Sequence, residues 1–441
     1  MTDPNTVAAM RADARAIFSA GIAAADPYDA TRHALLEHKS AIDAARRVFL
    51  LAGGKASLAM MRAALAIVPG DRVTRAVAVT NPENAGSRDG LARVDIHVGG
   101  HPLPDAGGAA GAAAIEAAAS QAAAGDLVIC LISGGASALM PAPVAGVSLD
   151  DKIAATGALL RSGADICEVN TVRTALSRLK GGGLARAASP ARVLGLILSD
   201  VPGDDPATIA SGPTVPRDID PRQALDVIDR YDLAVSMPAS VMDHLRAAPP
   251  RAAAPEEGIE NRVIGSNAIS LAACEERARA LGYDTVIAAR WLDGDVAEAA
   301  ELLIGTTIEA AAGHARRLAV LAGGETTVRV VGHGKGGRNQ ELALRFALAA
   351  GEMVPGGPWV MLSGGTDGRD GPTDAAGGLV DPGTVSRMTD AGMAPADRLA
   401  DNDAYRALKA SGDLLMTGPT GTNVADLQIV LMAPDRVSAD T

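Results

Sequence analysis

The stretch DLVICLISGGASALM (residues 126–140) decides the fold class. Its run LVICLI is apolar throughout, which is typical of a strand that is covered on both faces, as strands in parallel sheets are. Ser133, Gly134 and Gly135 follow at once as a tight turn, and an alanine-containing segment then favours a helix. A strand, a glycine turn and a helix in this order predict an α/β fold.

The same pattern of an apolar run followed by a glycine turn recurs along the chain. It is found in residues 47–57, 192–205, 262–273, 317–327, 359–368 and 414–423. Helices are expected between these runs, over about 106–124 with Asp105 as N-cap, and over about 153–163, 172–188, 268–280, 295–318 and 338–349. We therefore expect Rossmann-like α/β architecture with mostly parallel sheets.

A length of 441 residues is typical of two domains. The stretch 246–261 contains three prolines, shows no periodicity and is the best candidate linker. We accordingly expect an N-terminal α/β domain over 1–245 and a C-terminal α/β domain over 262–441, whose last residues have the option of packing back on the first. A weak echo between LLAGGKAS and VLAGGETT is better explained by the general preference of strand-to-helix turns for glycine than by two related halves.

The composition excludes several classes of protein. Apolar residues make up 48% of the chain, far more than a disordered protein contains, and the 49 glycines are clustered instead of falling at every third position. Aromatic residues make up only 2% of the chain, which is too few to form a surface on which nucleic-acid bases could stack. The core must therefore be aliphatic and rich in alanine.

The net charge of −12 disfavours nucleic acid or an anionic membrane as the main partner. The three cysteines are far apart and match neither a disulfide framework nor a zinc motif, and no apolar run reaches transmembrane length. The N-terminus has acidic residues and no apolar core of a signal peptide. These features predict a cytoplasmic protein with small-molecule partners and leave the oligomeric state open, a homodimer being one option.

Ligands of open α/β sheets bind beyond the carboxyl ends of the strands, where glycine turns and helix N-termini suit phosphate. Lys55 follows such a turn, Gly53-Gly54, and a cation at a helix N-terminus is unfavourable unless an anion is near. Ser133, Gly134, Gly135 and Ser137 form a second possible anion nest, although a simple N-cap explains the spacing equally well.

Arg338 follows a predicted strand, TVRVV (residues 327–331), and starts a helix, where its guanidinium can hold phosphate or carboxylate in a bidentate manner. Directly before it, Gly332, Gly334 and Gly337 match the dinucleotide pattern G-x-G-x-x-G. The next predicted strand ends in Ser363 and not in the acid that would bind ribose, which weakens the dinucleotide hypothesis. Neither a P-loop nor the protein-kinase motif set is present in the sequence.

Two acidic loops are candidates for metal or base chemistry. Asp367 and Asp374 lie on the glycine-rich loop 363–378 and suit Mg²⁺, whereas Asp370 on the same loop is expected to be a solvated turn residue. Asp200 directly ends a buried strand, where an acid is costly unless it is used, so it is our candidate metal ligand or base. His97 and His101 flank another glycine loop but match no zinc spacing.

Taken together, these motifs resemble the class II glycerate 2-kinases, whose C-terminal part is called the MOFRL domain. The similar stretches include LLAGGKAS, GGHPLPDAGG, LISGGASALMPAP, SDVPGDDPATIASGPT, GGRNQELAL, SGGTDGRDGPTDAAGG and TGPTGTNVADLQI, spread over about residues 50–432. Several exceed eight residues, and we see no departure from the family pattern in them.

The resemblance implies two α/β domains with an active site in the cleft between them. It also implies transfer of the γ-phosphoryl group of ATP to the 2-hydroxyl of D-glycerate, with Mg²⁺. Lys55 and Arg338 match the family's active-site lysine and arginine. Further candidate substrate and phosphate ligands, with Arg173 or Lys180 for the glycerate carboxylate, are Gly265, Ser266, Asn267, Glu325, Asn339, Thr420 and Asn423. An NAD(P)H-dependent hydroxypyruvate reductase, a label that members of this family sometimes carry, and a non-catalytic sensor are the alternatives.

Overall fold

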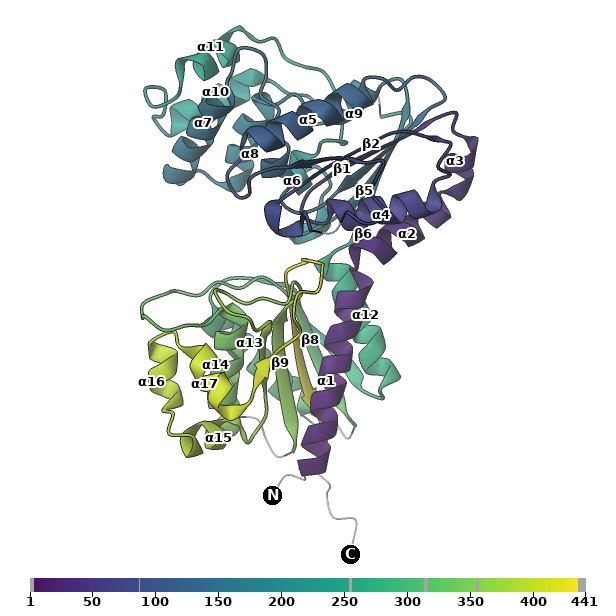
Figure 1. Ribbon diagram of the computed structural model, residues 1–441. Helices are drawn as coiled ribbons and strands as arrows, with labels where there is room; N and C mark the ends of the chain where they lie inside the picture. The colour runs from purple at the N-terminus through teal and green to yellow at the C-terminus, as the bar shows by residue number, and fades with distance from the viewer. Residues whose placement is uncertain (1–3, 87, 254–255, 313–315, 354–356, 435–441) are drawn as a thin grey trace, which may run out of the picture. The chain divides into compact units, whose positions relative to one another are not determined.

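The computed structural model describes residues 4–86, 88–253, 256–312, 316–353 and 357–434. The chain forms two compact units (Figure 1). The N-terminal unit runs from Pro27 to Ile264, and the C-terminal unit combines the residues up to Asp26 with those from Gly265 onward. The division differs from the expected one, because the first 26 residues belong to the C-terminal unit.

The N-terminal unit is built on a six-stranded sheet in the order β3-β2-β1-β4-β5-β6. The strands are β1 (Val48–Gly53), β2 (Val73–Thr80), β3 (Asp95–Val98), β4 (Leu127–Ile132), β5 (Arg192–Leu198) and β6 (Ile259–Gly265). The pairs β3·β2, β2·β1, β1·β4 and β4·β5 are all parallel, as the continuous apolar runs predict. β6 occupies part of the segment expected to be a linker, so the chain is still in regular structure there.

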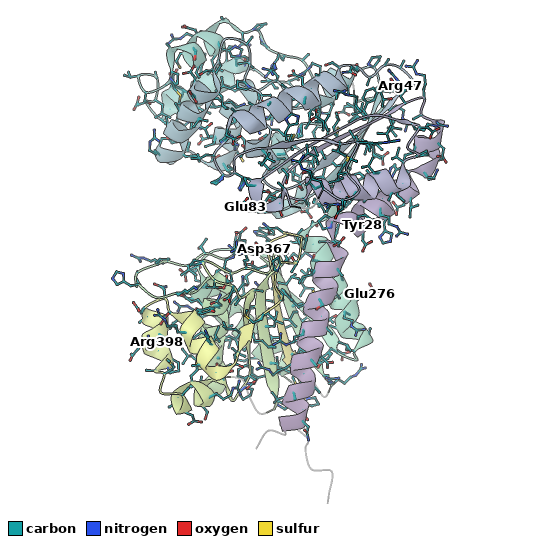
Figure 2. The ribbon with its side chains drawn as sticks, in the orientation of Figure 1. Tyr28, Arg47, Glu83, Glu276, Asp367 and Arg398 are labelled. Atoms are coloured by element: carbon teal, nitrogen blue, oxygen red, sulfur yellow. The ribbon has the colours of Figure 1, made fainter. Side chains whose placement is uncertain are left out.

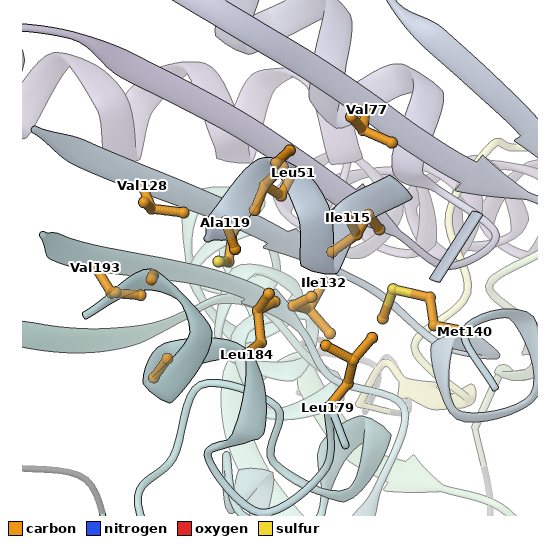
Figure 3. Close-up of a cluster of buried hydrophobic side chains, with 14 of the residues drawn as sticks. Leu51, Val77, Ile115, Ala119, Val128, Ile132, Met140, Leu179, Leu184 and Val193 are labelled. Carbon is orange, nitrogen blue, oxygen red and sulfur yellow. The ribbon is translucent and has the colours of Figure 1, made fainter. Parts of the chain in front are cut away.

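Both faces of this sheet are covered by helices, and successive side chains of β1 point alternately to the two faces. Phe49 and Leu51 pack with α5 (Ala106–Ala119) and α9 (Gly183–Ala188), whereas Leu50 and Ala52 pack with α2 (Pro27–Glu37) and α4 (Ser57–Ile67). Figure 3 shows the first of these clusters, which is aliphatic almost throughout. A separate helical layer contains α7 (Leu149–Arg161), α8 (Ile166–Ala175), α10 (Pro221–Arg230) and α11 (Ala239–Ala247).

The helix expected over 172–188 is two helices in the structure. α8 ends at Ala175 and α9 begins at Gly183, because Gly181 and Gly182 have φ of +57° and +76°. These left-handed conformations suit glycine and cannot continue a helix. The break leaves Lys180 in the turn between the two helices.

The C-terminal unit has a second six-stranded sheet in the order β11-β10-β9-β12-β8-β7. Its strands are β7 (Asp284–Leu292), β8 (Leu318–Gly324), β9 (Trp359–Gly365), β10 (Gly377–Val380), β11 (Leu414–Leu415) and β12 (Asp426–Met432). Four strands run in one direction, while β10 and β12 run against them. The apolar run expected at the start of 414–423 forms the short β11, and the long strand that follows, β12, begins at Asp426.

The helix α1 (Pro4–Ala24) packs with α12 (Asn267–Ala280) on one face of this sheet (Figure 1). Met10, Ile17 and Phe18 of α1 are buried there, and Ser270 Oγ donates to the carbonyl of Gly21 at 2.7 Å. The opposite face is covered by α13 (Val296–Ala311), α14 (Arg338–Met353) and α17 (Ala404–Ser411). The apolar face of α1 explains why the start of the chain belongs with this unit.

The remaining helices are α3 (Lys39–Ala44), α6 (Ala136–Leu139), α15 (Thr384–Asp390) and α16 (Pro395–Ala400). Among the helices described above, none is both long enough and apolar enough to cross a membrane.

Candidate functional site

In the N-terminal unit, the turns after β1 and β4 are bonded to each other. Gly54 has φ +126°, and a β carbon placed on it would lie 2.2 Å from Ser133 Oγ, so only glycine allows this approach. The N–H of Lys55 donates to the carbonyl of Gly134 at 2.9 Å, and Ala56 N–H donates to Ser133 Oγ at 3.0 Å. The two turns therefore form one rigid platform that carries the Lys55 side chain.

This platform changes the roles expected for its glycines. The N–H of Gly54 donates to the Val79 carbonyl at 3.1 Å, and Gly53 accepts from Ser133 N–H through its carbonyl. Gly54 therefore serves the close approach of Ser133 and does not offer its N–H to phosphate. Across the described parts of the chain, the N–H groups of Gly134 and Gly135 have no hydrogen-bond partner, so these two remain available to an anion.

Three titratable side chains gather at Gly134 and Gly135. A β carbon on Gly134 would lie 2.2 Å from Asp200 Oδ2, and one on Gly135 would lie 3.2 Å from His101 Nε2 and 3.3 Å from Lys55 Cγ. Burial raises the pKa of Asp200, opposed in part by its own backbone N–H and by the Lys55 charge. Burial and the same lysine charge lower the pKa of His101. The structure thus brings the predicted pair Lys55 and Asp200 together and adds His101.

A cluster of two basic side chains, Arg173 and Lys180 around Ser137, lies beside this platform. Arg173 Nη2 and Lys180 Nζ each contact Ser137 Oγ at 2.5 Å, and Lys180 also donates to Ser211 Oγ at 3.3 Å. Two cationic donors occupy both lone pairs of the Ser137 hydroxyl, so its own proton must point to another acceptor. The cluster therefore contains the Arg173 guanidinium, the Lys180 amino group and one hydroxyl donor.

No ion pair joins Arg173 or Lys180 to a carboxylate within the described ranges, although Lys180 is only 3% exposed. Burial, together with Arg173 and Lys152, lowers the pKa of Lys180 well below its usual range. Lys152 is likewise buried and donates to the Leu176 carbonyl at 3.1 Å; burial and three arginines lower its pKa to about 7. An anion bound beside these side chains would stabilise their protonated forms, so the cluster is a candidate site for an anionic ligand.

In the C-terminal unit, Arg338 opens α14 and is held by two carboxylates. Its Nε and Nη2 donate to Asp426 Oδ2 and Oδ1 at 2.5 and 2.9 Å, and its Nη1 lies 2.8 Å from Glu325 Oε1. Asp426 is the first residue of β12, in register with Gly324 and Gly365 at the ends of β8 and β9. The antiparallel direction of β12 thus brings an acid to the edge where parallel strands present their carboxyl ends.

Asp370 was expected to be solvated, and the structure contradicts this. It is 3% exposed and caps α14, accepting from the N–H groups of Asn339 and Gln340 at 3.1 and 2.8 Å. Burial raises the pKa of Asp370 to about 6 against the effect of these hydrogen bonds. Asp370 therefore fixes the helix end on which Arg338 stands.

The two predicted metal ligands have different surroundings. Asp367 lies at the end of the sheet (Figure 2), and its Oδ1 accepts from Arg369 N–H at 2.9 Å. A β carbon on Gly365 would lie 3.3 Å from Asp367 Oδ1 and 3.5 Å from Asp426 Oδ1. Asp374 is exposed and accepts from the Tyr405 hydroxyl at 2.7 Å, which lowers its pKa. Nowhere in the described ranges do three acidic, histidine or cysteine side chains form a metal cluster.

Several other candidate ligands have structural partners. Asn267 Nδ2 donates to the carbonyls of Val424 and Asp426 at 2.8 and 2.9 Å, and thereby fixes the start of β12. Asn339 Oδ1 accepts from Ser363 Oγ at 2.6 Å. The others lie at helix or loop ends: Gly265 ends β6, Ser266 N-caps α12, Thr420 Oγ1 donates to the Thr366 carbonyl, and Asn423 is exposed.

The glycine loop before Arg338 is bonded to the segment 401–403. The N–H groups of Gly332 and Lys335 donate to the side chains of Asn402 and Asp403, and Gly334 N–H donates to the Asp401 carbonyl at 2.8 Å. A dinucleotide fingerprint needs such N–H groups for pyrophosphate. In this chain Gly332 and Gly334 allow a close approach to segment 401–403, whereas Gly337 approaches Asp370. The strand expected over 327–331, before this loop, is not formed: of these residues only Thr327 makes an isolated bridge, to Asp295.

The sequence interpretation missed Asp426, Lys152 and the role of Asp370. Asp426 had a detectable signal, because an acid directly before the apolar run LQIVLM is as unusual as Asp200 directly after its strand. Lys152 had none, since it stands on an ordinary amphipathic helix and its burial follows from the packing of α7 on α8.

Comparisons with known proteins agree with this architecture. A model described as a domain of unknown function, DUF4147, matches residues 13–246, and the MOFRL family model matches residues 318–426. A crystal structure of glycerate kinase from Thermotoga maritima superimposes with a TM-score of 0.88 at 36% identity, covering 96% of this chain and all of that one.

Curated relatives point in the same direction. D-glycerate 2-kinase of Thermotoga maritima is 39% identical over 389 residues, which cover 88% of this chain and 91% of that protein. A putative hydroxypyruvate reductase of Agrobacterium vitis is 40% identical over 423 residues, which cover 95% and 93%. This chain therefore belongs to the MOFRL family of glycerate 2-kinases.

Proposed function

We propose that this protein transfers the γ-phosphoryl group of ATP to the 2-hydroxyl of D-glycerate, giving 2-phospho-D-glycerate and ADP. The observation that carries the proposal is the similarity to a D-glycerate 2-kinase over 88% of the chain. The cationic groups of the N-terminal unit support it, because phosphoryl transfer depends mainly on positioning and charge neutralisation.

In this proposal Lys55 neutralises charge on the transferred phosphoryl group, and Arg338 contributes its positive charge to binding of the polyphosphate. The free N–H groups of Gly134 and Gly135 bind a phosphate oxygen next to the Lys55 ammonium. Asp200 accepts the proton of the glycerate 2-hydroxyl while the oxygen of that hydroxyl forms a bond to the γ-phosphorus of ATP. The bond from that phosphorus to the bridging oxygen breaks, and ADP leaves with the electron pair. A raised pKa makes Asp200 a stronger base than an exposed aspartate.

The glycerate carboxylate binds in this proposal beside Ser137, Arg173 and Lys180, where it provides the carboxylate partner that the two basic side chains lack among the described residues. We predict that Lys180→Met raises the KM for D-glycerate roughly tenfold or more and leaves the KM for ATP within about twofold, because a charged hydrogen bond contributes ~1.5–3 kcal/mol. Initial rates at varied glycerate and ATP measure both constants. Lys39→Met is the control, since it removes an exposed lysine of the same unit that pairs with Asp43 and does not contact Ser137. An unchanged KM for glycerate in Lys180→Met would place the carboxylate elsewhere.

Mg²⁺ would accompany ATP in this proposal and would reduce the negative charge of the phosphates, with Asp367 as the residue that would hold it. The surroundings of Asp367 fit the ion, since a second carboxylate, Asp426, also lies beside Gly365. Asp374 is the weaker candidate because the Tyr405 hydroxyl already binds its carboxylate.

We predict that Asp367→Asn raises the Mg²⁺ concentration needed for half-maximal rate by about tenfold, because the amide loses the charge that binds the ion. Rates at fixed ATP and varied Mg²⁺ test this, with Asp374→Asn as the comparison. A Mg²⁺ titration identical to that of the unsubstituted enzyme would remove Asp367 from the metal site.

One assay tests the proposed reaction. The protein is incubated with D-glycerate and MgATP, and the product is coupled to enolase, which accepts 2-phosphoglycerate directly, so a signal also identifies the phosphorylated hydroxyl. A parallel incubation with hydroxypyruvate and NADH tests the reductase alternative. Oxidation of NADH without ATP-dependent product would overturn the proposal, although the occupied N–H groups of the 332–335 loop argue against a dinucleotide there.

A further inference from the structure

Arg338 has two carboxylate partners that differ in burial and geometry. The Asp426 side chain is 1% exposed and accepts two hydrogen bonds from the guanidinium. The Glu325 side chain is 47% exposed and makes one contact, to Nη1 at 2.8 Å. The first pair is a buried bidentate pair, which is costly to break, whereas the second belongs to the exposed class that contributes little.

The two carboxylate partners of Arg338 also differ in how their main chains and side chains are held. Asp426 opens β12 between β8 and β9, and Asn267 binds its carbonyl, so neither its main chain nor its side chain has room to move. The N–H of Glu325 donates to the Leu292 carbonyl at 2.8 Å, which fixes its main chain. Among the described residues, the polar contact of its side chain is the one to Arg338. Rotation of the Glu325 side chain would therefore release Nη1 without disturbing the sheet.

We propose that Glu325 occupies, in the free enzyme, the position on Arg338 Nη1 that an anionic phosphate oxygen takes when the polyphosphate ligand binds. Asp426 is the permanent partner and positions the guanidinium, while Glu325 is the exchangeable one. This assignment rests on the proposed function, which makes ATP the anionic ligand of Arg338. It replaces the expectation that Glu325 itself contacts phosphate, since two anions in contact repel each other.

The proposed exchange would make Arg338 selective among anions of different charge. Without Glu325, the exposed side of Arg338 would remain open to any small anion. A weakly held carboxylate excludes weak monovalent competitors and yields only to a multiply charged ligand, which gains more from the arginine than the exposed pair is worth. The cost is a lower affinity for the ligand itself, and that cost is measurable.

The test measures the dissociation constant of inorganic triphosphate by calorimetry for the full-length protein. Glu325→Gln, which keeps shape and removes charge, is expected to bind triphosphate about threefold to tenfold more tightly. Chloride is expected to weaken that binding more strongly in Glu325→Gln than in the unsubstituted protein. Glu275→Gln is the matched control: it removes one acid from a salt bridge with Arg279 in the same unit and is expected to change affinity by less than about twofold.

Equal or weaker triphosphate binding in Glu325→Gln would overturn the assignment, and weaker binding with a higher Mg²⁺ requirement would make Glu325 a metal ligand instead. Failure of every variant to bind triphosphate would also overturn it, because Arg338 would then have no such anion to receive. The glycerate assay separates the two proposals. If the protein phosphorylates glycerate but Glu325→Gln does not bind triphosphate more tightly, only the proposed exchange is refuted. If Glu325→Gln binds triphosphate more tightly but the protein does not phosphorylate glycerate, only the proposed glycerate kinase function is refuted.

Discussion

Lys55→Ala is expected to lower kcat roughly 10²–10⁴-fold while the protein stays folded, as for the loss of an electrostatic group that stabilises a transition state. The bonded turns that carry Lys55 use main-chain atoms and Ser133, so they do not need its side chain. Circular dichroism and the thermal midpoint should therefore be close to those of the unsubstituted enzyme. The enolase-coupled assay at saturating ATP and glycerate measures the loss.

Lys39→Ala is the control for Lys55, because Lys39 is an exposed lysine of the same unit that pairs with Asp43. It is expected to retain full turnover. Near-normal kcat in Lys55→Ala would mean that this ammonium does not act on the transferred group. The platform would then be explained as a tight turn with a surface lysine.

Arg338→Ala is expected to lower kcat by roughly 10²–10³-fold and also to destabilise the protein. The stability effect arises because Asp426 would be left buried without its partner, a loss of about 3 kcal/mol, at the low end for buried pairs since Arg338 is 33% exposed. Steady-state kinetics and denaturant unfolding measure the two effects separately.

The double variant Arg338→Ala, Asp426→Asn separates catalysis from stability. Removing the unpaired charge is expected to restore much of the unfolding free energy, whereas turnover should remain as low as in the single variant. Recovery of turnover in the double variant would show that Arg338 serves only to neutralise Asp426. Arg338→Lys is expected to be poorly active as well, because an ammonium cannot form the bidentate pair that fixes the guanidinium.

Much of the fold could be predicted because short apolar runs and glycine turns are local signals. The strands β1, β4, β5, β8 and β9 and the helices α5, α12 and α14 lie where the sequence places them. The errors fall where local signals are weak or misleading. The alanine-rich α1 gives no indication of the sheet on which it packs, and the direction of β12 depends on its neighbours and not on its own residues.

For the candidate site, too, the sequence predicts what local signals carry and does not predict what depends on tertiary packing. Lys55, Asp200 and Arg338 could be proposed from the sequence because each stands at a strand end or helix start with a residue type that is costly there without a ligand. Asp370 was misjudged, since a Gly-rich acidic loop is usually solvated, and only packing shows that it caps α14. Lys152 was invisible for a similar reason, because burial of a helix face is a property of the pair of helices.

By itself, then, the sequence determined the α/β class, the places of the glycine turns and the identity of the charged residues that follow them, because these depend on neighbours within a few positions. The tertiary structure alone decided which of those charges meet. It placed Arg173 and Lys180 on one serine hydroxyl and gave Arg338 one buried and one half-exposed carboxylate partner. It also used N–H groups of a dinucleotide-like loop to bind a neighbouring segment. Electrostatic energy depends on distance and burial, and both are set by contacts between residues far apart in the chain.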